Sequence, residues 1–389
     1  MTEKEIGYFR IFQEVARAVL SVLSVKEVLH LISKRIVVVL NAKASALMLI
    51  NRETGSLEIM ASHLLSKEYL SKGPLDPERS ISETLKGGPV LVEDAPTDKR
   101  IQYRDMARKE GIASILSVPM TIRGEVTGVL RIYTARPRTF TVNELELISA
   151  MAEIGAIAIE NAHLFETKEA ELLELLERGG VDYDYNPPAE KYRIKAVSKG
   201  QISPEKSYHY FRELHALTRT IAANMEVGKI MENVVKEIAQ AMEVKGCSLL
   251  WLNSLTKELE LIATYGLSQA YLAKGPLKID RSIPQALDGE AIFIENVQED
   301  PRIQYPEAAQ EEGIVSILSV PIFVKERVRG VLRLYSSKSI PFVQEEIEFA
   351  KAAAEIGGIA ILNAKLYQAR GHDISFWMST LDYLGITDS

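Results

Sequence analysis

Two arginine–tyrosine pairs stand at matching positions in the chain and have the chemistry to hold an anion. Arg131 and Tyr133 lie in the segment GVLRIY, and Arg333 and Tyr335 lie 202 residues later in GVLRLY. In an extended strand, alternate side chains share a face, so each arginine points the same way as its tyrosine. A guanidinium there can bind a carboxylate or phosphate with two parallel hydrogen bonds. The alternative is that Arg131 pairs with an internal acid, such as one in Glu93–Asp94, and only supports the fold.

Further polar side chains recur at the same offset and widen the candidate site. An Arg-Ser dipeptide stands in an irregular stretch of each half, and a tyrosine and a serine precede each arginine–tyrosine strand. We expect these side chains either to line one ligand cavity in each half or to seal it. The additional candidates are Arg79, Tyr103 and Ser114 in the first half, and Arg281, Tyr305 and Ser316 in the second.

These positions belong to an internal repeat. The stretch from Ile101 to Tyr133 returns from Ile303 to Tyr335 without a gap, and Asn161 returns as Asn363. One domain therefore occurs twice. We expect a first domain at 1–177, a linker at 178–203, a second domain at 204–370 and a short amphipathic tail at 371–389.

Hydrophobic periodicity predicts the same order of elements in both halves: two helices, a hairpin, an irregular segment, a strand pair and a long helix. In the first half we expect helices over 5–23, 26–40 and 103–110, and strands over 44–51, 56–62, 90–92, 113–119 and 125–135. Pro119 and Pro321 are expected to end their strands, because proline cannot donate to a ladder. Thr141 and Glu144 form the spacing of a capping box at the start of the long helix.

The long helix of the first half carries an apolar stripe beyond the predicted domain. Its leucines are Leu172, Leu173, Leu175 and Leu176. Exposed apolar helix surface indicates a partner, so we expect a homodimer through the first and last helices of the domains. The alternative is that the stripe packs on the chain's own linker.

Composition argues against several classes of partner. The 389 residues carry a net charge of −7, whereas nucleic acids and anionic membranes require clustered basic charge. The apolar runs are too short to span a bilayer, and the N-terminus lacks the apolar core of a signal peptide. We therefore expect a cytoplasmic protein with no nucleic-acid or membrane partner. Cys247 is the single cysteine, which excludes an intrachain disulfide.

The amino-acid sequences of both halves resemble the GAF family. The phrases that carry the resemblance are SVPMTIRGEVTGVLRIY with FTVNELELISAMAEIGAIAIENAHLF, and SVPIFVKERVRGVLRLY with FVQEEIEFAKAAAEIGGIAILNAKLY. The resemblance implies an α+β fold with two GAF-like domains. Each would have a central antiparallel sheet, its first and last helices on one face, and a small-molecule pocket under the irregular segment on the other.

The family's known ligands do not identify one for this chain. Bilin attachment in photoreceptor members needs a pocket cysteine, whereas Cys247 aligns with Ser45 on the first strand and is expected to be a small buried thiol. Members that reduce methionine sulfoxide need several cysteines. Haem would need a pocket histidine, and His63 is expected to be a surface or loop residue. The cofactor is therefore left unknown.

Family members mostly serve as sensory or regulatory modules that pass a signal to an effector domain. No effector domain is recognisable in this sequence. We expect a regulatory protein without catalysis that binds an unidentified small molecule in one or both domains. Its output would pass through the helix-mediated dimer, or through an effector protein on the tail near Phe376 and Trp377. The alternative is a non-catalytic adaptor whose pockets are closed and whose helices and tail bind another protein.

Overall fold

The computed structural model describes residues 3–20, 25–51, 54–80, 82–179, 202–223, 227–253, 258–275, 277–278, 289–324, 327–339 and 342–369. The chain divides into two compact units, one mostly N-terminal to His163 and one running from Leu164 to the C-terminus. Both units are α+β, as predicted. The tail and most of the linker lie outside the described residues, so the predicted domain boundaries stay predictions.

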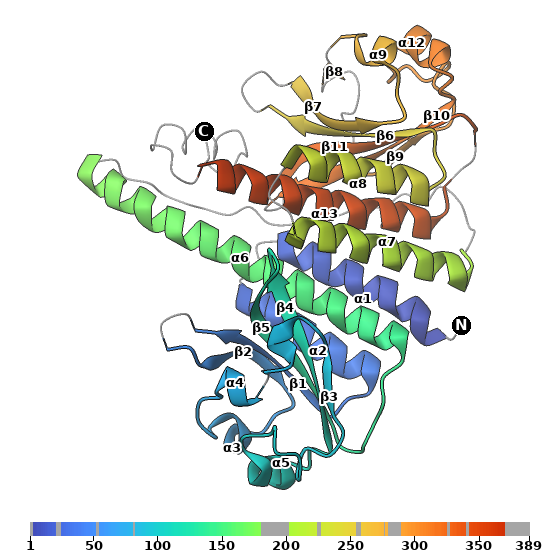
Figure 1. Ribbon diagram of the computed structural model, residues 1–389. Helices are drawn as coiled ribbons and strands as arrows, with labels where there is room; N and C mark the ends of the chain where they lie inside the picture. Colours follow the sequence, from blue (N-terminus) through green and yellow to red (C-terminus); the bar gives the residue numbers. More distant parts are fainter. Residues whose placement is uncertain are drawn as a thin grey trace. The chain divides into compact units, whose positions relative to one another are not determined.

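The first unit follows the predicted order of elements closely (Figure 1). In chain order it contains α1 (Glu3–Leu20), α2 (Val25–Leu40), β1 (Ala44–Ile50), β2 (Leu57–His63), α3 (Lys67–Leu70), α4 (Pro77–Ser80), η1 (Thr84–Lys86), β3 (Val90–Val92), α5 (Arg104–Glu110), β4 (Ser114–Ile122), β5 (Glu125–Thr134) and α6 (Val142–Gly179).

The sheet of the first unit is antiparallel and has the order β2-β1-β5-β4-β3. Helices α2 and α6 pack on one of its faces. Gly155 of α6 approaches so closely that a Cβ there would lie 3.3 Å from Ile32 of α2, and also from Leu47 and Met120 of the sheet. The segment that holds α3, α4 and α5 covers the opposite face (Figure 1).

A buried apolar cluster joins that segment to the sheet. Its members come from β1, β3, β4 and β5 and from the covering segment: Ala44, Ala46, Tyr69, Val92, Ala95, Ile101, Ala107, Ile112, Ile115 and Tyr133. The two faces of the sheet are therefore both buried, one by long helices and the other by a mostly irregular stretch. Any site between this stretch and the sheet therefore has one wall of regular strands and one wall of mostly irregular backbone.

The second unit repeats this arrangement. It contains α7 (Pro204–Ala223), α8 (Val227–Ala241), β6 (Gly246–Leu252), β7 (Glu258–Tyr265), α9 (Gln269–Leu272), β8 (Leu277–Lys278), β9 (Ile292–Ile294), α12 (Pro306–Glu311), β10 (Ser316–Val324), β11 (Arg327–Ser336) and α13 (Gln344–Ala369). Its strand order is β8-β7-β6-β11-β10-β9. The added strand β8 pairs with β7, where the first unit has the single bridge Leu57–Leu75.

The expectation that Pro119 and Pro321 end their strands is wrong. Strand β4 continues to Ile122, with Pro119 opposite Val129, and β10 likewise continues to Val324. Within the described residues, β3 pairs with β4 only from Ile115 to Ser117. At Pro119 the outer side of β4 is thus a sheet edge, where a missing N–H breaks no ladder hydrogen bond.

The long helix begins where its capping box predicts. The Glu144 amide donates to Thr141 Oγ1 at 3.2 Å, and the Thr141 amide donates to Glu144 Oε2 at 3.1 Å. Helix α6 then runs without a break to Gly179. The side chains of the predicted stripe, Leu172 to Leu176, lie outside the described part of the molecule. In the described chain, no helix has the length and apolarity needed to cross a membrane.

Candidate functional site

Arg131 lies in the middle of the sheet of the first unit. Its strand, β5, is flanked on both sides, and the residues opposite Arg131 are Ala46 of β1 and Ser117 of β4. Tyr133 lies two residues further along β5 and belongs to the apolar cluster beneath the covering segment. Because alternate side chains share a face, Arg131 points to this side as well, as the sequence predicts.

The guanidinium of Arg131 is buried next to hydroxyl groups. Arg131 is 3 % exposed, and its Nε donates to Ser117 Oγ at 3.2 Å. It also hydrogen-bonds with the Tyr133 hydroxyl. Glu93 and Asp94, the acids considered as alternative partners, are exposed, and Asp94 accepts a hydrogen bond from Thr97. A guanidinium carries five N–H donors in a planar fork, which suits recognition of carboxylates and phosphates.

The covering segment places a second cation near Arg131. Lys72 follows α3, and its Nζ lies 3.9 Å from the centre of the Tyr69 ring and donates to Tyr69 O at 3.1 Å. The Tyr69 ring in turn packs edge-on against Tyr133, with 5.8 Å between ring centres. We name Tyr69, Lys72, Arg131 and Tyr133 the first cluster.

The two cations of the first cluster repel each other. Burial, followed by the charge of Arg131, lowers the pKa of Lys72 to about 8, while the Glu110 carboxylate acts in the opposite direction. Burial raises the pKa values of both tyrosines, so their hydroxyls stay neutral. The first cluster therefore offers positive charge and neutral hydroxyls in a poorly hydrated place.

The second unit contains the same arrangement. Tyr271, Lys274, Arg333 and Tyr335 form the second cluster, in which Arg333 is 3 % exposed. The Lys274 Nζ lies 3.5 Å from the centre of the Tyr271 ring, and the Tyr271 and Tyr335 rings meet edge-on at 5.9 Å. Burial and the charge of Arg333 lower the pKa of Lys274 to about 8.

One hydroxyl contact distinguishes the two clusters. In the second, the Tyr335 hydroxyl hydrogen-bonds with Ser248 Oγ at 2.8 Å. In the first, Ala46 stands at the equivalent position, and the Tyr133 hydroxyl hydrogen-bonds with Tyr69 of the covering segment. The covering segment is thus linked to the sheet tyrosine by a hydroxyl contact in the first unit.

A GAF-domain family model matches residues 22–160, and a second GAF-domain model matches residues 226–361. The chain is a tandem GAF-domain protein. The two repeats found in the sequence are its two GAF domains, and the resemblance on which the fold was predicted is confirmed. GAF domains are known as sensory and regulatory modules.

Solved structures show likeness to single GAF domains. One is the GAF domain of a phosphoenolpyruvate-protein phosphotransferase from Coxiella burnetii, which is 23% identical, with a TM-score of 0.38, over 41% of this chain and 97% of that one. Another is a free methionine-R-sulfoxide reductase from Neisseria meningitidis in complex with its substrate, which is 18% identical, with a TM-score of 0.37, over 43% of this chain and 96% of that one. A search of proteins with curated functions gave no match.

Tyr103 and Tyr305 hold the loop that follows Lys72 or Lys274 in each GAF domain. The Tyr103 hydroxyl donates to Pro74 O at 2.9 Å. Gly73 has a φ of +99°, and a Cβ there would lie 3.0 Å from that hydroxyl. The same close approach joins Gly275 to Tyr305. Both tyrosines therefore pack against the backbone of this loop. Whether they line or seal a cavity stays a prediction.

The prediction that Ser114 and Ser316 share the cavity is wrong. Ser114 precedes Ile115, which faces the covering segment, so the serine side chain turns toward the helices. There it is buried and hydrogen-bonds with Thr134. The hydroxyl of Ser316 donates to Lys338 O at 2.7 Å. Period-two alternation separates both serines from the arginine–tyrosine face.

The two remaining candidates, Arg79 and Arg281, stay predictions. Arg281 lies outside the described residues, as does the side chain of Arg79. Cys247 is a buried free thiol whose pKa is raised by burial, as expected of a structural cysteine.

Within the described part of the chain, no group of three or more histidine, cysteine or acidic side chains lies close enough together to hold a metal ion.

Sequence reasoning missed the lysines of both clusters. Tyr69 and Lys72 return as Tyr271 and Lys274 at the repeat offset, so the signal was present. It was hidden because these residues lie some sixty positions before Arg131 and Arg333, in a segment without periodic structure. Only the folding of that segment over the sheet brings lysine and arginine together.

Proposed function

We propose that this protein is a non-catalytic tandem-GAF sensor whose domains bind a small anion, carrying a carboxylate or a phosphate, at the first and second clusters. The observation that supports the proposal is the paired cation cluster, which occurs in both GAF domains with the same four residue types. A cytoplasmic location accompanies the proposal as a prediction of the sequence.

The electrostatics of the clusters favour an anionic ligand. Lys72 and Arg131 lie close enough for the arginine charge to lower the lysine pKa, and neither cation is fully hydrated. A carboxylate or phosphate between them would replace repulsion with two attractions, and the arginine fork could bind it through two hydrogen bonds. Because the pKa of Lys72 is about 8, its share of this attraction is present below pH 8 and is lost as the pH rises above it.

Ligand binding at a cluster can change the geometry of the domain. Tyr69 and Lys72 belong to the covering segment, whereas Arg131 belongs to the sheet, so an anion held by both would tie the two walls together. Within the covering segment, Glu110 of α5 accepts a hydrogen bond from the Ser66 amide, and Ser66 caps α3. For a signal to result, the anion must bind one arrangement of these walls more tightly than another. We propose that the output passes through a dimer of the first and last helices or through a partner bound to the tail.

The first experiment is native mass spectrometry of the purified chain, followed by denaturation and analysis of released small molecules. We expect a co-purifying anion. Changing Lys72 or Lys274 to Gln, which removes a partly exposed charge, should release it from the corresponding domain. The Arg131→Lys and Arg333→Lys variants keep the charge but lose the fork, and should weaken binding. The domain that loses its anion identifies the copy that binds.

A specific observation favours the adaptor as a second candidate. Arg131 and Tyr133 are 3 % and 1 % exposed, so the first cluster is closed by its own side chains. An empty chain whose melting temperature does not respond to carboxylates or phosphate esters would contradict the sensor proposal. It would direct the search to proteins that bind the helices and tail, and deletion of 373–389 would then test the tail.

A further inference from the structure

A groove separate from the first cluster runs between α2 and the outer strand β2 of the first GAF domain. Its volume is about 650 Å³, and the residues that line it lie on α2 and on β2. Small-molecule sites in proteins usually span roughly 300 to 1,000 Å³ and combine apolar walls with a few polar groups. The groove has the size of such a site.

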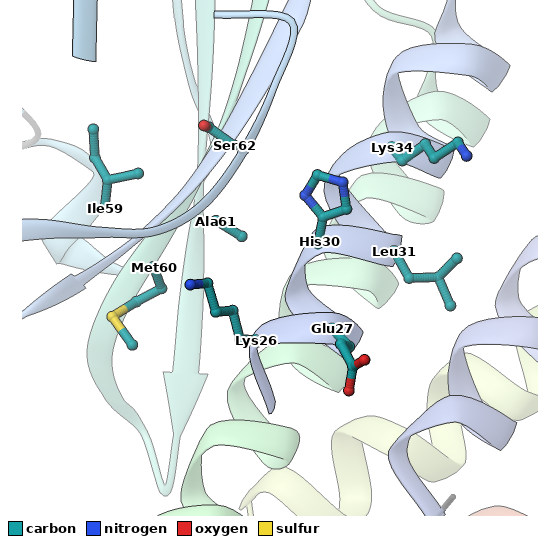
Figure 2. A pocket seen from close by; sticks show the side chains of 9 residues that line it. All are labelled: Lys26, Glu27, His30, Leu31, Lys34, Ile59, Met60, Ala61 and Ser62. Carbon is teal, nitrogen blue, oxygen red and sulfur yellow. The ribbon is translucent and has the colours of Figure 1, made fainter. Parts of the chain in front are cut away.

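One wall of the groove is basic. Lys26, His30 and Lys34 follow one another at intervals of four residues, so they lie along one side of α2. Figure 2 shows the side chains of Lys26 and His30 directed from α2 toward β2, whereas Glu27 points away from the strand. The charge that faces the strand is therefore positive.

The other wall is apolar. Strand β2 contributes Ile59, Met60 and Ala61 to the groove. Met60 is 39 % exposed, which is unusual for a thioether on a sheet. A flexible, polarisable methionine adapts its shape to an apolar ligand. This wall can hold a hydrocarbon body, while the helix opposite supplies charge.

Two histidine rings meet beside the groove. The ring of His63, the last residue of β2, meets the ring of His30 edge-on with 5.9 Å between centres. Burial and the charges of His30 and Lys34 lower the pKa of His63, so it is neutral at pH 7. A neutral imidazole still has one N–H to donate to an oxygen.

The second GAF domain lacks three of these side chains, whereas Lys34 returns as Lys236. Glycine stands at 228 where the first domain has Lys26, Glu232 replaces His30, and Tyr265 replaces His63. The replacement of His30 by Glu232 puts a carboxylate where an anion in the first domain would meet an imidazole. The repeat thus supplies an internal comparison, in which the fold and Lys34 are kept while Lys26, His30 and His63 are replaced.

We propose that the groove between α2 and β2 of the first GAF domain binds an organic anion of the fatty-carboxylate class. The carboxylate head lies at Lys26 and His30, and the hydrocarbon chain lies along Met60 and Ala61. The second GAF domain has no such site. The two GAF domains would then respond to different ligands, even though their buried clusters are alike.

Decanoate binding to the full chain, measured by isothermal titration calorimetry at pH 7, tests the proposal, with decan-1-ol as the uncharged ligand of equal chain length. We expect one saturable decanoate site and weaker binding of decanol. The double variant Lys26→Gln/His30→Glu should bind decanoate at least about tenfold more weakly. Both side chains are exposed, so the variant should fold, and its melting temperature verifies this. Met60→Asp should weaken binding similarly.

Two matched controls locate the site. Lys229→Gln/Lys236→Gln changes the corresponding helix of the second domain and should leave decanoate affinity unchanged. So should Lys109→Gln, which removes an exposed charge on α5, outside the groove. Decanol binding as tight as decanoate, full affinity in the Lys26→Gln/His30→Glu variant, or loss of binding in either control variant would each overturn the proposal.

Discussion

At the residue scale, the central feature of this protein is a permanent charge placed inside each GAF domain. Arg131 and Arg333 are each 3 % exposed and cannot lose their proton at physiological pH. A neighbouring lysine can adapt, because its pKa falls when burial and a like charge disfavour its ammonium form. Lys72 and Lys274 show this adaptation twice.

The depressed lysine pKa predicts a pH-dependent stability. A pKa of about 8 in the folded chain lies below the ordinary value of 10.5, so the unfolded state binds more protons between these values. The destabilising effect of each lysine is therefore complete below pH 8 and diminishes as the pH rises toward 10.5. We expect the melting temperature of the native chain to rise between pH 8 and 10 relative to that of Lys72→Met/Lys274→Met. A difference that is constant from pH 7 to 10 would contradict the buried-cation account.

At the scale of the element, the sheet depends on close contact between its two central strands. Gly128 of β5 lies opposite Leu49 of β1, and a Cβ added there would overlap the Met48 carbonyl oxygen. In the second domain, a Cβ at Gly330 would lie 2.5 Å from Leu250 O. Backbone atoms cannot yield as the end of a flexible side chain can. The glycines allow the strand that carries each arginine to pair with its neighbour.

We predict that Gly128→Ala destabilises the first GAF domain by about 1–3 kcal/mol, since the new methyl group forces the strands apart. Urea unfolding, followed by far-ultraviolet circular dichroism, measures the change in the free energy of unfolding. Gly88→Ala is the matched control, because a Cβ at Gly88 meets no atom within 4 Å, and it should be nearly neutral. Equal stability of the two variants would show that the strands accommodate the methyl group.

At the scale of the whole molecule, two domains of one fold follow one another in the chain, and a long helix continues from the first. Helix α6 packs on the sheet of the first GAF domain at Gly155, and its backbone continues as a helix to Gly179. The predicted dimer uses the leucines of this extension, and the proposed difference between the two domains lies in the groove beside α2. The molecule would thus combine two sensing units with one means of output.

The dimer is tested by a single charge in the apolar stripe. Leu173→Asp should shift the mass measured by light scattering from dimer to monomer, because a carboxylate is costly in an apolar helix seam. Glu174→Gln, which changes a polar position beside it, should leave the mass unchanged. A native chain that is monomeric, or a Leu173→Asp chain of unaltered mass, would contradict the seam.

The sequence by itself determined the doubling of the domain, the order of its elements and the face to which Arg131 and Tyr133 point. These features are local or periodic: a constant offset, a capping box at Thr141, and the alternation of a strand. It also named Tyr103 as a residue that lines or seals the cavity, and left that choice open. It was wrong at Pro119, where the absence, among the described residues, of a neighbouring strand on the outer side decides the outcome, and at Ser114, which the alternation of its own strand turns toward the helices.

Only the tertiary structure decided which side chains meet. Lys72 approaches Arg131 because the segment around α3 folds back over the sheet, and no periodic pattern encodes that path. The same holds for Lys26 and His30, whose role depends on Met60 lying opposite them on β2. Secondary structure follows from short-range preferences along the chain, whereas a binding site is made of contacts between distant segments, and these form only when the core is packed.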